Sequence, residues 1–118
     1  MSELVKPLIA RLKQAVSFVE LRGHSSDRYL EAVLVKPHLE GCITLLREVF
    51  GPPLKEFGQP ALFDAKMQKA LSLIGGIRTD QALSFAKDEA QLVAYASLWP
   101  WASDATRVKL KVGLLELK

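Results

Sequence analysis

The sequence predicts an all-α fold of five or six helices, packed as one helical domain over residues 1–118. Apolar residues recur at helical spacing through most of the chain, prolines and glycines divide it into pieces of helical length, and only one segment, near the C-terminus, alternates as a strand does. A chain of 118 residues that is 49% hydrophobic and 25% charged is large enough for one core without disulfides or metal.

The first two helices are predicted from proline, glycine and serine positions. Pro7 can occupy the first helical position, and Gly23 stands where a helix end favours glycine, so we expect a helix over residues 7–22. Ser25 and Ser26 are suitable N-caps for a short second helix that Pro37 should end. Four residues would form the apolar side of this helix: Tyr29, Leu30, Val33 and Leu34.

Three longer helices are expected after Pro37. The segment 37–50 carries the clearest helical stripe and ends at Gly51, and a further stripe runs over 60–74 to Gly75 and Gly76. Thr79 is a good N-cap for a helix over 80–98, or alternatively Asp88 starts a second helix after a break at Lys87. Apolar residues are too widely spread in that last segment for a single stripe, which favours a helix buried on more than one side.

The C-terminal segment 106–117 admits two structures. Residues 107–112 alternate with period two, as a half-buried strand would, whereas Asp104 as an N-cap gives an acceptable helix. The helix is preferred because an isolated strand is not stable. If the segment is a strand, the favoured partner is the same strand of a second copy, which would make a dimer, and residues 32–35 are the other candidate.

No group of polar residues in the sequence predicts a metal site or a catalytic site. His38 and Cys42 lie four residues apart, but Cys42 also belongs to the apolar stripe, so we expect it to pack in the core rather than bind a metal. The run from His24 to Asp27 holds the residue types of a catalytic triad. Side chains this close in sequence generally cannot place the base between the nucleophile and the acid. We expect the serines to cap a helix instead. No cofactor and no catalytic residue is predicted.

Two further features have structural explanations. Gly75 and Gly76, followed by Arg78, could cradle an anion, but these glycines follow a helix and are explained by a helix C-cap. Asp88 and Glu89 point to different sides of a helix and cannot act as an acid–base pair.

The aromatic cluster around Pro100 is the main functional candidate. Tyr95, Trp99 and Trp101 can fill the core or anchor a partner, because Trp and Tyr dominate interface hot spots, and both alternatives stay open. An alternating strip nearby is the candidate for self-association: Leu110, Val112 and Leu114.

We therefore expect a small non-catalytic protein–protein interaction module, such as a regulatory, adaptor or chaperone-like subunit. Its partner is a protein or a second copy of the chain. The alternative is a nucleic-acid-associated or transcription-regulating protein, because the formal charge is +3 and basic residues gather near the tryptophans. The residues of that alternative are Arg78, Arg107, Lys109 and Lys111.

The compartment follows from absences in the sequence. One cysteine excludes an intramolecular disulfide, and no stretch resembles a signal peptide or a membrane span. We expect a cytoplasmic protein without a membrane partner.

Overall fold

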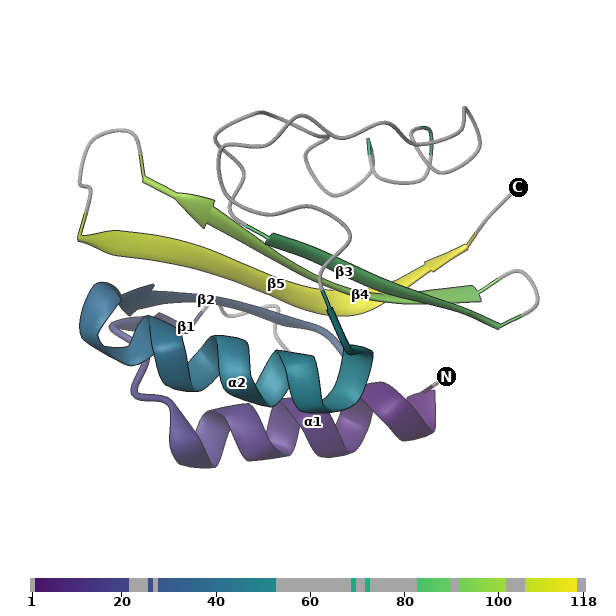
Figure 1. Ribbon diagram of the computed structural model, residues 1–118, viewed down its shortest axis with the longest axis horizontal. Helices are drawn as coiled ribbons and strands as arrows, with labels where there is room; N and C mark the ends of the chain where they lie inside the picture. The colour runs from purple at the N-terminus through teal and green to yellow at the C-terminus, as the bar shows by residue number, and fades with distance from the viewer. Residues whose placement is uncertain are drawn as a thin grey trace.

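An antiparallel sheet organises the chain. The computed structural model describes residues 2–21, 26, 28–52, 69, 72, 83–89, 92–101 and 106–116. Within these residues, two helices cover one face of the sheet, which is an α+β arrangement (Figure 1). The prediction of an all-α helical bundle with five or six helices is therefore wrong.

The described elements follow one another as α1 (Ser2–Ala15), β1 (Glu20–Leu21), β2 (Leu30–Val35), the short 3-10 helix η1 (Lys36–His38), α2 (Leu39–Phe50), β3 (Leu83–Glu89), β4 (Leu92–Pro100) and β5 (Arg107–Glu116). The strand order is β1-β2-β5-β4-β3, and every neighbouring pair is antiparallel. The last strand in sequence, β5, therefore lies at the centre of the sheet.

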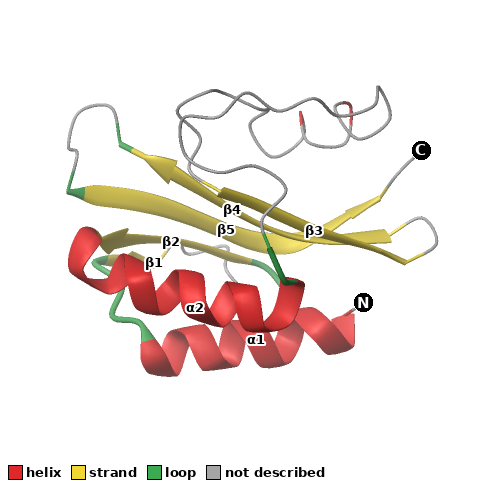
Figure 2. Cartoon of the chain, viewed as in Figure 1, coloured by secondary structure: helices red, strands yellow, loops and turns green. Residues whose placement is uncertain are grey.

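The core lies between the two helices and the sheet. α1 and α2 lie side by side on the same face and run in opposite directions (Figure 2). Leu8 and Leu12 of α1 and Leu46 of α2 are almost completely buried there. Burial of each such side chain contributes about 2 kcal/mol. The sheet contributes alternate residues of three strands: Leu30, Ala32, Leu34, Ala94, Ala96, Leu98, Val108, Leu110 and Val112.

α1 is displaced from the predicted helix over 7–22. It already includes Ser2 and ends at Ala15, so Pro7 lies in its second turn instead of opening it. A proline there removes only one backbone donor, and the buried apolar stripe outweighs this loss. After α1 the chain forms the short edge strand β1, and the Val19 N–H donates to the Val33 carbonyl at 2.8 Å.

The predicted helix over 37–50 is confirmed. Pro37 lies in η1, and α2 continues from Leu39 to Phe50. Gly51 ends α2 with a positive φ of 78°, and its N–H donates to the Arg47 carbonyl at 2.9 Å. Glycine adopts this backbone conformation without the steric cost that other residues incur.

Two other predicted helices are strands. The second helix is β2, and the helix over 80–98 is the antiparallel pair β3 and β4. The spacing of apolar residues predicted helices in both segments because β2 and β4 are buried on both faces. Their continuous apolar runs therefore lack the alternation that identifies a strand. The β-branched residues of Leu30–Val35 favour a strand, but the run is short enough to match a helical stripe as well.

The C-terminal segment is a strand, contrary to the preferred helix. Its partner in the sheet is β2, the less favoured of the two candidates: Ala32 lies opposite Leu110 and Leu34 lies opposite Val108. β5 also pairs with β4 along its other edge. Both edges of β5 are therefore used inside the chain over Val108–Val112, which leaves no edge there for the same strand of a second copy.

The predicted helix over 60–74 lies outside the described residues, apart from helical positions at Lys69 and Ser72. The Ser72 hydroxyl donates to the Lys69 carbonyl at 2.6 Å.

Candidate functional site

The sheet face turned away from α1 and α2 carries the chemistry-bearing side chains. Strand residues alternate between the two faces. Since the even-numbered residues of β2, β4 and β5 pack in the helix-side core, their odd-numbered neighbours lie on the other face. We call this surface the cation–aromatic face and define it by Tyr29, Glu31, Tyr95, Trp99, Trp101, Arg107, Lys109 and Lys111.

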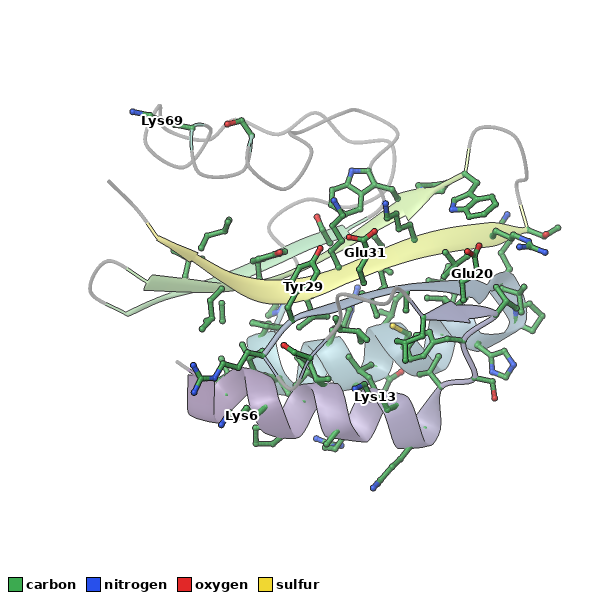
Figure 3. All side chains as sticks on the ribbon, turned by 180° about the vertical axis from the view of Figure 1, so that it is seen from behind. Lys6, Lys13, Glu20, Tyr29, Glu31 and Lys69 are labelled. Atoms are coloured by element: carbon green, nitrogen blue, oxygen red, sulfur yellow. The ribbon has the colours of Figure 1, made fainter. Side chains whose placement is uncertain are left out.

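Glu31 lies at the centre of this face. The Tyr29 hydroxyl donates to Glu31 Oε1 at 2.8 Å, and Lys109 Nζ lies 3.1 Å from Oε2. Lys111 lies directly opposite Glu31 in the strand register. Figure 3 shows Tyr29 and Glu31 together on the side of the sheet away from the helices. Both carboxylate oxygens have partners, which a buried charge requires.

Two cations lie against indole rings. Lys111 Nζ is 5.3 Å from the centroid of the Trp99 ring, and Arg107 Cζ is 5.3 Å from that of Trp101. Both distances fit cation–π attraction, worth about 0.5–2 kcal/mol depending on exposure. The backbone N–H of Trp101 also donates to the Arg107 carbonyl at 3.0 Å, which fixes the end of β4 against the start of β5.

The basic residues form a row. Arg107, Lys109 and Lys111 occupy alternate positions of β5, so successive side chains on this face are about 7 Å apart. Burial lowers the pKa of Lys111, and the positive charge of Lys109 lowers it further, while Glu31 opposes the change. Burial is thus the main cause of the lowered pKa of Lys111.

Two tyrosines enclose Gly113. A Cβ at this position would lie 3.0 Å from Tyr29 Cδ1 and 3.1 Å from the Tyr95 hydroxyl, closer than ordinary contacts. Burial raises the pKa of both tyrosines, and the Glu31 charge raises both further. Both hydroxyls therefore stay protonated near neutral pH, and that of Tyr29 donates its hydrogen bond to Glu31.

The predicted anchors differ in exposure. Tyr95 is 2% exposed and Trp99 is 7% exposed, whereas Trp101 is only half-buried. Trp99 therefore fills the core, whereas Trp101 is partly exposed. The structure brings all three predicted anchors to one face, but mainly the Trp101 end of β4 remains accessible.

The predicted self-association strip is not an exposed surface, because all three of its residues pack against the core on the helix side of the sheet. Leu110 and Val112 point into the helix-side core with no exposed area, and Leu114 packs partly buried against the same core. Of the basic residues of the nucleic-acid alternative, the structure brings together Arg107, Lys109 and Lys111. Arg78 lies outside the described residues.

Sequence reasoning missed Tyr29, Glu31 and Gly113. The missing signal is strand register, because Glu31 is significant only when it faces Lys111 across β2 and β5. The alternation of residues 107–112 was visible and would have placed three cations on one face if the strand alternative had been preferred.

The other sequence candidates lie elsewhere. Cys42 is completely buried in the core, as predicted, and burial raises the pKa of its thiol to about 12. His38 is exposed in η1. Among the residues that the structure describes, no group of three His, Cys, Asp or Glu side chains could hold a metal ion.

The serine run forms a turn where it is described. Ser26 Oγ accepts a 3.1 Å hydrogen bond from the Arg28 N–H, and the Ser26 N–H donates to the Tyr29 carbonyl at 2.7 Å. Ser26 thus leads into a strand instead of capping a helix. Gly75 and Gly76 lie outside the described residues, and Asp88 and Glu89 are in β3.

A shallow hollow lies on the helical side of the molecule, with a volume of about 260 Å³, lined by Arg11, Gln14, Ala15 and Leu45. Beside it, Arg11 pairs with Glu48 at 2.6 Å, joining α1 to α2. About half of each of these two side chains is exposed, so the pair contributes little to stability.

The chain matches no known protein-family model, no curated protein and no solved structure. Among the described helices, none has the length and apolar character needed to cross a membrane.

Proposed function

We propose that this protein is a non-catalytic interaction module that binds a protein partner through the accessible end of its cation–aromatic face. The observation that carries the proposal is the stacking of Arg107 on Trp101, both half-buried, where β4 meets β5. Arg and Trp are the residue types most enriched among interface hot spots. The stack presents both on a rigid sheet, so little side-chain entropy is lost on binding.

Chemistry at the described residues supports binding over catalysis. Both tyrosine hydroxyls of the face stay protonated, and the Cys42 thiol is neutral and enclosed in the core. The Glu31 carboxylate is almost buried, forms an ion pair with Lys109 and accepts a hydrogen bond from the Tyr29 hydroxyl. These groups lack the ionised, accessible state that nucleophiles and general bases need.

A partner other than a second copy is favoured. The apolar strip considered for self-association is used up inside the chain, because Leu110 and Val112 are completely buried. The single buried thiol fits a reducing compartment, so we place the interaction in the cytoplasm.

Co-purification with matched variants tests this proposal. The tagged protein is isolated from its native cell as wild type, as Arg107→Ala and as Lys13→Ala, which removes an exposed cation on α1 at the opposite side of the molecule. Binding of the identified partner is then measured with purified proteins. We expect Arg107→Ala to weaken the complex about tenfold or more and Lys13→Ala to leave it unchanged. Equal binding by all three would refute the proposal.

Nucleic-acid binding is the second candidate, favoured by the row of Arg107, Lys109 and Lys111 beside aromatic rings. Such a combination can hold the backbone of a single strand and stack its bases. If this function is the right one, affinity for single-stranded probes falls steeply with salt. Absence of binding at low salt would eliminate it.

A further inference from the structure

We draw no further inference here: the strongest candidate, the surface patch that the exposed side chains of Val19 and Leu21 form at the edge strand β1, carries nothing because nothing in the structure shows what covers it.

Discussion

Lys109 Nζ lies 3.1 Å from Glu31 Oε2, and this pair joins β2 to β5 in the middle of the sheet. Glu31 is only 9% exposed, so its charge depends on the partners that the fold supplies. A buried charge that loses its partner is costly, whereas an exposed one is not. Removal of one partner from the Glu31–Lys109 pair should therefore cost more stability than removal of one partner from the surface pair of Arg11 and Glu48.

Glu31→Ala should destabilise the protein by about 2 kcal/mol, because it leaves Lys109 and Lys111 close together without the carboxylate between them. Glu31→Gln should cost about half as much, since the amide oxygen still accepts from Tyr29. Urea unfolding measures both. Glu48→Gln is the matched control and should change stability by less than about 1 kcal/mol. Equal effects at positions 31 and 48 would show that the central pair is not energetically special.

Gly113→Ala and Gly41→Ala should change stability in opposite directions. An alanine at 113 would press its methyl group against Tyr29 and Tyr95, so we expect a loss of about 1 kcal/mol. At position 41, in exposed α2 surface, no atom lies within 4 Å of an added Cβ. There the higher helix propensity of alanine should add up to about 1 kcal/mol. Thermal unfolding compares the two variants, and a stabilised Gly113→Ala would contradict the close packing of the tyrosines.

One helix, α2, and the burial of Cys42 in the core could be predicted from the sequence, because the signals that define this helix all lie within it or next to it. α2 has a full stripe, a proline before it and a glycine after it, so nothing distant is needed to define it. β4 is the opposite case. Val93, Tyr95 and Trp99 are buried on one face and Ala94, Ala96 and Leu98 on the other, which removes the alternation that identifies a strand.

The residues between β3 and β4 also gave no sign of a hairpin. The register places Glu89 opposite Leu92, and the residues between them are Ala90 and Gln91. Neither is a residue that two-residue hairpin turns favour. Thr79 meanwhile offered a plausible helix start. The candidate site depends on Glu31 lying opposite Lys111, a strand pairing between residues 80 positions apart in the sequence, which only the strand register reveals.

Trp99 and Trp101 should behave differently in quenching experiments, although they are two residues apart. Trp101→Phe leaves Trp99, which is 7% exposed, so its emission should be blue-shifted and poorly quenched by iodide. Trp99→Phe leaves the half-buried Trp101, whose emission should be quenched more strongly. Equal quenching constants for the two variants would contradict the proposed accessibility of the Trp101 end of the face.

Cys42 makes stability depend on pH in the alkaline range. Its pKa is about 12 in the folded protein, above the ordinary value of 9.0, because burial disfavours the thiolate. The resulting stability is fully present below pH 9 and is lost as the pH rises toward 12. Cys42→Ala should remove this part of the pH dependence while lowering stability by about 1 kcal/mol through the lost side-chain packing. An unchanged slope between wild type and variant in urea unfolding at alkaline pH would show that the thiol is not shielded.

Lys111 has the opposite linkage, and its neighbours provide a two-sided test. Burial and the Lys109 charge lower its pKa, so the cost of holding the charged amine is present at neutral pH and is relieved as the pH rises toward the ordinary lysine value of 10.5. Lys109→Gln should raise the pKa of Lys111, because a like charge is removed, and Glu31→Gln should lower it, because an opposite charge is removed. Side-chain NMR titration of Lys111 measures both shifts, with Lys13→Gln on α1 as the variant expected to cause none. Shifts of the same sign from Lys109→Gln and Glu31→Gln would mean that local rearrangement, rather than the charges of the cation–aromatic face, sets the pKa of Lys111.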